Sequence, residues 1–191
     1  MKARTGLFAA ALVAALLQIG FLAWMIQARA DILRNGREVR LKVEPVDPRD
    51  LLRGDYVRLG YAISVIPKTL FSTPPAGALA EGAIVLVDVL ADEKGLFQPV
   101  AAHLSENAPP QRVASVRLRG TLASSSPLSA DTVRLRYGIE RFYLPEGEGR
   151  AIEADMRERS FHVIAAVSDA GQAQIKAFLD GDTILYEEPF Y

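Results

Sequence analysis

The chain has 191 residues, half of them hydrophobic, and its 22 basic and 23 acidic residues give a formal net charge of −1. This length is enough for one ordinary domain with a hydrophobic core, and the balanced charge excludes a bulk electrostatic attraction to nucleic acid. The lack of cysteine excludes disulfides, thiol nucleophiles, thiolate metal sites and an acylated lipoprotein cysteine.

The first predicted element is a charge-free, apolar run at residues 6–28, which follows a short tail at residues 1–5. A helix of this length crosses the ~30 Å hydrocarbon core of a bilayer at about 1.5 Å per residue. Trp24, near the end of the run, suits the membrane interface. We therefore expect a single transmembrane anchor in contact with membrane lipid, followed by a linker at residues 29–36.

Two features of this region leave alternatives open. Ala28-Arg29-Ala30 offers small residues at the positions that signal peptidase reads, so a cleaved signal peptide competes with the anchor; the length of the apolar run favours the anchor. Lys2 and Arg4 precede the run, whereas five basic residues follow it, and a literal count of positive charge would put the C-terminal side in the cytoplasm. Those five residues are Arg29, Arg34, Arg37, Arg40 and Lys42.

Beyond Gly36 the apolar residues alternate with polar ones, and this pattern predicts a mainly antiparallel β domain at residues 37–191. We expect an antiparallel β-sandwich or a partly open barrel. Phe71–Gly82 reads as a loop and Gly149–Arg159 as one short helix, and Pro99 assigns its strand to a sheet edge. The expected strands are 37–43, 57–66, 84–90, 96–103, 112–122, 132–143, 161–167, 172–179 and 183–187.

The second of these strands follows a turn that Asp47 and Asp50 are placed to cap and that Gly54 ends. Its alternation puts one set of side chains in the core and the other on the opposite face. The core set is Val57, Leu59, Tyr61, Ile63 and Val65, and the opposite set is Tyr56, Arg58, Gly60 and Ser64.

The same residues carry a family resemblance. Gly54-Asp55-Tyr56-x-x-Leu59-x-Tyr61 resembles the signature of the bacterial GDYXXLXY domain family, a group of uncharacterised membrane-anchored proteins, and all five named positions match. The stretch 137–147, Tyr-Gly-Ile-Glu-Arg-Phe-Tyr-Leu-Pro-Glu-Gly, is similar to a later block of the family. The resemblance implies an anchor and an extracytoplasmic domain, often encoded beside large polytopic membrane proteins, and it implies no activity.

Arginines between core residues form the candidate contact surfaces. Val-Arg-Leu recurs at residues 39–41, 57–59, 116–118 and 133–135, and the simple explanation is that each arginine lies on the solvent face of a strand. The alternative is a cationic face for lipid headgroups or an acidic partner, made by Arg117, Arg119, Arg134 and Arg136. Within the octapeptide, Tyr56, Arg58 and Gly60 are the candidates for contact with a partner.

Catalytic groups are sparse. Asp55, Glu140 and Glu146 are the carboxylates from which a catalytic pair could be drawn, although structural roles explain them better. His103 and His162 have no ligand at metal-binding spacing, so no metal site is expected. No phosphate loop, dinucleotide fingerprint or nucleic-acid surface occurs, so no cofactor is expected.

The sequence thus favours a non-enzymatic, single-pass protein of the cytoplasmic membrane, whose extracytoplasmic β domain docks to another envelope component. A polytopic membrane protein is the expected partner. The alternative is a membrane-tethered enzyme that acts on an envelope substrate through a carboxylate pair.

Overall fold

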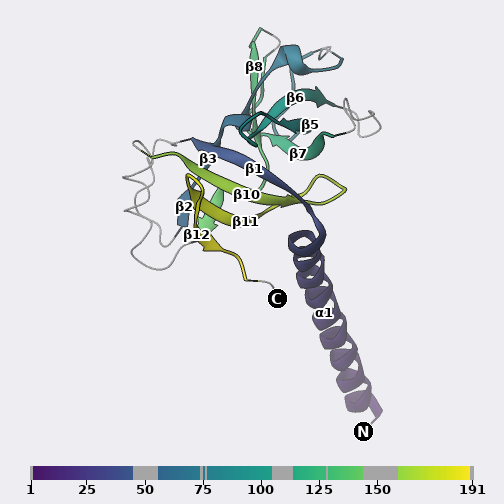
Figure 1. Cartoon of the computed structure of the whole chain (residues 1–191). Helices are drawn as coiled ribbons and strands as arrows, with labels where there is room; N and C mark the ends of the chain where they lie inside the picture. Colours follow the sequence, from purple (N-terminus) through teal and green to yellow (C-terminus); the bar gives the residue numbers. More distant parts are fainter. Residues whose placement is uncertain are drawn as a thin grey trace.

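The computed structural model describes residues 2–44, 56–73, 75, 77–104, 114–127, 129–143 and 159–189. One long helix, α1 (Lys2–Asn35), projects from a mainly β domain, with the N-terminus at its far end (Figure 1). The strands are β1 (Arg37–Glu44), β2 (Tyr56–Arg58), β3 (Gly60–Tyr61), β4 (Val65–Pro67), β5 (Ile84–Ala91), β6 (Phe97–His103), β7 (Val116–Leu122), β8 (Thr132–Arg136), β9 (Arg141–Tyr143), β10 (Phe161–Val167), β11 (Ala173–Asp180) and β12 (Thr183–Glu187).

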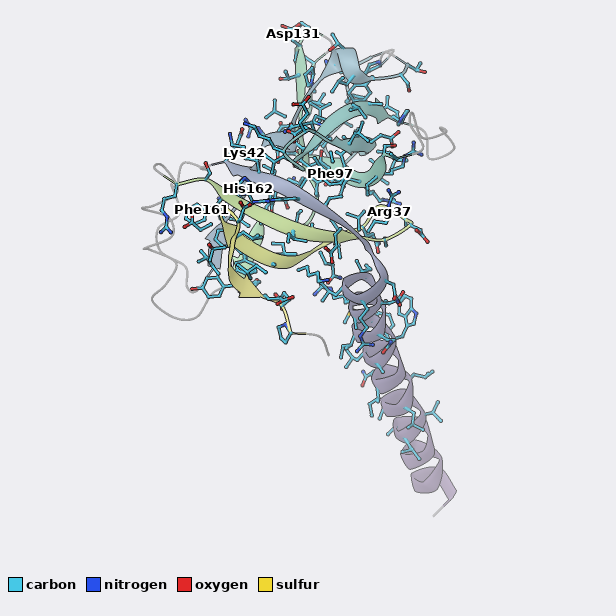
Figure 2. All side chains as sticks on the ribbon, in the orientation of Figure 1. Arg37, Lys42, Phe97, Asp131, Phe161 and His162 are labelled. Atoms are coloured by element: carbon cyan, nitrogen blue, oxygen red, sulfur yellow. The ribbon has the colours of Figure 1, made fainter. Side chains whose placement is uncertain are left out.

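The helix α1 stands clear of the domain along most of its length. Every residue from Ala11 to Arg29 is exposed, and Figure 2 shows the helical side chains pointing outward on all sides. The segment Ala11–Asn35 is long and apolar enough to cross a membrane, with a mean hydropathy of 1.9 in its most apolar window. An exposed helix that is apolar all round is typical of a membrane span or a signal sequence and not of a helix in a soluble core.

Among the described side chains of α1, those that pack against the domain lie at its C-terminal end. Ala30 and Leu33 are buried there, where the helix contacts β10 and β11. A Cβ at Gly36 would lie 2.4 Å from the carbonyl oxygen of Ile32 and 2.9 Å from the backbone nitrogen of Val167. Glycine therefore permits the close approach at which the chain leaves the helix and enters β1.

The β domain contains two five-stranded antiparallel sheets, in the orders β12-β11-β10-β1-β3 and β4-β8-β7-β5-β6, and a two-stranded ribbon of β2 and β9. One cluster of buried side chains runs through both sheets and includes Leu41, Tyr61, Val87 and Leu118. The expected mainly β, antiparallel architecture is confirmed, and it takes the form of two packed sheets.

The sheets are joined at the turn between β10 and β11. The backbone nitrogen of Arg119 in β7 donates to the carbonyl oxygen of Gly171, 2.8 Å away. Gly171 has φ +81°, and a Cβ there would lie 2.9 Å from that same nitrogen. Only glycine allows both this backbone conformation and this contact.

Several predicted elements are confirmed. β5 and β6 form the expected hairpin, and β6, which contains Pro99, lies at the edge of its sheet. Strands β1, β7, β10, β11 and β12 occur within a few residues of their predicted bounds. The segment Phe71–Gly82 contains only isolated bridges among its described residues.

The single strand predicted at 57–66 is wrong. The chain instead enters the ribbon as β2, joins β1 as β3, turns through a 3-10 helix, η1 (Ala62–Ser64), and joins β8 as β4, before a second 3-10 turn, η2 (Lys68–Leu70). The turn at η1 reverses the alternation: Val65, expected in the core, is 39% exposed, whereas Ile66 is fully buried. Ser64, expected on the opposite face, is also buried.

The single strand predicted at 132–143 is wrong as well, because it is divided into β8 and β9. Gly138 lies between them with φ +83°, a left-handed conformation that breaks a strand. The predicted helix Gly149–Arg159 and the capped turn from Asp47 to Gly54 lie outside the described residues, apart from Arg159 at the helix end.

Candidate functional site

The two stretches that carry the family resemblance meet in the core through a reciprocal pair of tyrosines. The Tyr61 hydroxyl donates to the carbonyl oxygen of Ile139 at 2.6 Å, and the Tyr137 hydroxyl donates to the carbonyl oxygen of Ile63 at 2.8 Å. We call these four residues the tyrosine clasp. Each phenol satisfies a buried carbonyl in the opposite segment, so the clasp fixes the register between the two segments.

Burial, reinforced by the charge of Glu140, raises the pKa of Tyr61 and that of Tyr137 well above their usual value. Both phenols therefore remain neutral donors. The Glu140 carboxylate accepts bonds from the backbone nitrogens of Tyr137 and of Gly138, the latter at 3.0 Å. These bonds stabilise the turn that carries one half of the clasp.

The predicted contact and acidic residues are dispersed. Leu59 and Tyr61 are buried, Gly60 lies opposite Glu44 in the β1–β3 pair, and Arg58 is exposed in the ribbon opposite Arg141. The backbone of Tyr56 pairs with that of Tyr143 in the same ribbon. Gly54, Asp55 and Glu146 lie outside the described residues.

The four arginines of the proposed cationic face extend along one side of β7 and β8. These strands pair only at Thr121–Arg136 and Leu122–Leu135, which places Arg117 and Arg134 at opposite ends, about 20 Å apart at the usual rise of a strand. Arg136 lies 3.6 Å from Glu81, and Arg119 is half-buried. The guanidinium of Arg117 faces a buried carboxylate.

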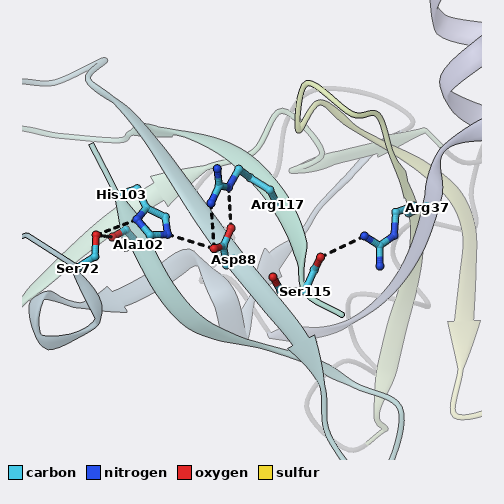
Figure 3. A network of polar contacts seen from close by, with 7 residues as sticks. All are labelled: Arg37, Ser72, Asp88, Ala102, His103, Ser115 and Arg117. Atoms are coloured by element: carbon cyan, nitrogen blue, oxygen red, sulfur yellow. Dashed lines mark hydrogen bonds and ion pairs between the residues drawn. The ribbon is translucent and has the colours of Figure 1, made fainter. Parts of the chain in front are cut away.

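That carboxylate, Asp88, is the centre of a polar assembly that was not predicted from the sequence (Figure 3). Its Oδ1 accepts from Arg117 Nε at 2.7 Å, and its Oδ2 accepts from Arg117 Nη2 at 3.0 Å. His103 Nε2 lies 3.1 Å from the same Oδ2, and His103 Nδ1 lies 2.8 Å from Ser72 Oγ. We call these four residues the Asp88 chain.

The hydrogen-bond partners define the tautomer of His103. An ionised carboxylate only accepts, so in the neutral imidazole Nε2 carries the proton and donates to Asp88, and Nδ1 accepts from the Ser72 hydroxyl. Asp88 is fully buried and His103 is 4% exposed, whereas Ser72 is exposed. The assembly therefore links an exposed hydroxyl through an imidazole to a buried carboxylate.

Two sequence features could have indicated part of this assembly. Asp88 is the only charged residue in the apolar run Ile84–Leu90, and a charge in such a run needs a partner. His103 ends the next strand of the same hairpin and comes opposite Leu86. Ser72 had no signal, because it lies in a loop whose path the alternation does not define.

A second candidate site is an open cleft of about 590 Å³ between the end of α1 and the sheet beside it. We call it the junction cleft. Arg29 and Leu33 line it from α1, Arg141 and Tyr143 from β9, Ile175 from β11, and Glu188 from the C-terminal segment. Its lining combines apolar and charged side chains, which suits an amphipathic ligand.

The fold is that of a mainly β domain carried on one long, exposed, apolar N-terminal helix. The chain belongs to the GDYXXLXY protein family, whose match covers residues 18–178, from the second half of α1 into β11. Neither a curated protein nor a solved structure matches the chain. Within the described residues, no three His, Asp or Glu side chains are grouped to hold a metal ion.

Proposed function

We propose that the protein is a single-pass membrane protein, which holds its β domain against the outer face of the cytoplasmic membrane as a non-enzymatic docking module. The observation that carries this proposal is the contrast along α1. Its residues are exposed from Ala11 to Arg29, but Ala30 and Leu33 are buried by the domain. The domain is thereby attached at the end of an apolar helix of membrane-spanning length.

The same contact supports an uncleaved anchor. Ala28-Arg29-Ala30, the segment that resembles a signal peptidase site, is helical, and Ala30 is packed against the domain. The chain then enters β1 directly after Gly36. Cleavage after Ala30 would remove part of the contact between the helix and the sheet.

The ribbon of β2 and β9 is the proposed docking surface for a polytopic membrane protein. It exposes Arg58 and Arg141 directly opposite one another, and Tyr143 is 70% exposed. Exposed arginine and tyrosine are the residues that most often dominate the energy of protein–protein contacts. Tyr143 and Arg141 also line the junction cleft, which places this surface near the helix.

The topology is tested with a reporter that is active only outside the cytoplasm, fused after Tyr191. The molecular mass of the same fusion shows whether its first thirty or so residues have been removed. We expect an active, full-length fusion. An inactive fusion would mean that the count of positive charge around the helix decides the orientation, and the domain would then be a cytoplasmic module.

Docking is tested by replacing Arg58 with glutamate and measuring the recovery of cross-linked membrane partners from intact cells. Arg134→Glu, also an exposed strand arginine but outside the ribbon, is the matched control. We expect recovery to fall for Arg58→Glu only, with unfolding temperatures unchanged. Equal recovery from both variants would remove the ribbon as the contact surface.

A second candidate function, hydrolysis by a serine nucleophile, is favoured by the Asp88 chain, whose order of hydroxyl, imidazole and carboxylate is that of hydrolase triads. It ranks second because Arg117 neutralises the carboxylate that would stabilise a protonated His103. Covalent labelling by an alkyl fluorophosphonate, lost in Ser72→Ala, would establish it. The carboxylate-pair alternative gains nothing from Glu140, whose oxygens accept bonds from two backbone amides.

A further inference from the structure

The junction cleft lies at a defined distance from the apolar part of α1. A helix that starts its hydrocarbon span at Gly6 completes ~30 Å after about 20 residues, close to Trp24. Phe21 and Trp24, whose ring centroids are 5.9 Å apart, form an aromatic pair at that level. Arg29 is five residues further along, or about 7 Å, and so reaches the depth of lipid headgroups.

The charged groups around the cleft favour an anionic ligand. Arg29 reaches it from α1 and Arg141 from β9, and Arg58 lies opposite Arg141 in the adjacent strand. Glu188 is the acidic side chain that lines it. Two guanidinium groups from separate elements suit a phosphate, because each presents a planar pair of donors to its oxygens.

The apolar groups favour a ligand that also carries hydrocarbon. Leu33 and Ile175 line the cleft and are buried. Ile26 also lines the cleft, belongs to the apolar run of α1 and is 59% exposed. A phosphate held between the arginines would therefore have an apolar path along α1 for attached acyl chains.

We propose that the junction cleft binds the headgroup of an anionic phospholipid, with Arg29 and Arg141 as its phosphate-binding pair. This inference rests on the proposed insertion of α1 into the membrane. Bound lipid would fix the tilt of the β domain on the membrane and so orient the ribbon of β2 and β9 towards a partner in the same bilayer.

The test uses the full chain in nanodiscs of phosphatidylcholine with a minority of phosphatidylglycerol. After extraction into detergent, the lipids that stay bound are counted by native mass spectrometry. We expect phosphatidylglycerol to be enriched over its share in the nanodisc. Arg29→Gln and Arg141→Gln should each weaken its retention about fivefold, since a basic residue at an anionic surface contributes roughly 1 kcal/mol.

Arg34→Gln is the matched control, because Arg34 is an exposed arginine on the same helix and is not among the residues that line the cleft. An equal loss in this variant would overturn the proposal in favour of diffuse surface attraction. Displacement of the lipid by inorganic phosphate at an equal concentration would show that the acyl chains add nothing to binding, and it would overturn the assignment to a lipid. Arg29 is exposed on the helix, so its variant tests the site even if Arg141→Gln unfolds the ribbon.

Flotation of the wild-type protein with vesicles separates the two proposals. A protein that does not float has no membrane anchor, and both proposals fail. A protein that floats but retains phosphatidylglycerol no better than phosphatidylcholine overturns the lipid site alone.

Discussion

The tyrosine clasp and the Asp88 chain are both buried polar assemblies, but the first is neutral and the second is charged. In the clasp, each phenol donates to one backbone carbonyl, so every bond joins two chain segments. In the Asp88 chain, one carboxylate with no solvent exposure receives donors from Arg117 and His103. The stability of the clasp thus depends on the fit of neutral groups, whereas the stability of the Asp88 chain depends on a buried carboxylate that keeps its donors.

This difference suggests a structural role for the clasp and makes the Asp88 chain the candidate for chemistry. The clasp joins the octapeptide to the stretch that begins at Tyr137, which gives Tyr61 a structural reason to be in the family signature. The Asp88 chain ends at Ser72, which is exposed to solvent. A buried charge connected to the surface by hydrogen bonds is the less stable arrangement of the two, because any lost partner leaves an unpaired ion.

The largest effect should come from breaking the charged assembly. Arg117→Met removes the bidentate partner of Asp88 and should destabilise the fold by about 3–5 kcal/mol. Denaturant unfolding of the full chain in detergent micelles measures this loss. Adding Asp88→Leu to Arg117→Met should restore most of it, since no charge is then left buried. A double variant as unstable as Arg117→Met would mean that packing, not charge, sets the cost.

The clasp should respond less. Tyr61→Phe keeps the ring in the core but leaves the carbonyl of Ile139 without its donor, at a cost of about 1–3 kcal/mol in unfolding free energy. Tyr137→Phe should cost a similar amount, because the two bonds are reciprocal. If the double variant loses much less than the sum of the two single variants, the bonds act as one unit. A loss near zero in both would show that the rings alone hold the register.

Much of the fold could be predicted, because period-two alternation predicts a strand wherever the chain runs straight with one buried face. It failed where the chain turns without interrupting the apolar pattern. At η1 the buried positions shift from Ile63 to Ile66 with no glycine or proline to mark the change. At Gly138 a marker was present, but the residues on both sides alternate well enough to suggest one strand.

The candidate sites were harder to predict. Asp88 and His103 meet only because β5 and β6 form a hairpin, and Ser72 joins them because its own backbone nitrogen donates to the carbonyl oxygen of Ala102. The junction cleft joins residues that are more than a hundred positions apart, Arg29 and Arg141. Neither arrangement follows from local pattern, because each depends on how distant strands pack.

Two glycines with positive φ, Gly138 and Gly171, differ in the space available for a side chain, and replacing each by alanine tests that difference. Gly138, in the turn before β9, has φ +83° and open space around its would-be Cβ, so Gly138→Ala should cost about 1–2 kcal/mol from backbone strain alone. Gly171 has a similar φ and also the close contact with Arg119, so Gly171→Ala should be clearly more destabilising. Thermal unfolding of both variants measures the difference. Equal unfolding temperatures would contradict the tight junction between the sheets.

The smallest effect should be a loss of stability at acidic pH, and we attribute it to His162. His162 lies opposite Lys42, where β1 pairs with β10 (Figure 2). Burial lowers its pKa, and nearby Arg40 lowers it further, against the opposing bond to the Gly181 carbonyl. On acidification the unfolded chain therefore takes up a proton first, near pH 6.5, and the fold loses stability as the pH falls below that value.

His162→Gln should remove this contribution, so its unfolding free energy should fall less steeply between about pH 7 and pH 5 than that of the wild type. Tyr61→Phe is the matched control and should leave the slope unchanged, because the raised pKa keeps that phenol neutral throughout this range. An unaltered slope in His162→Gln would mean that the proton is taken up elsewhere.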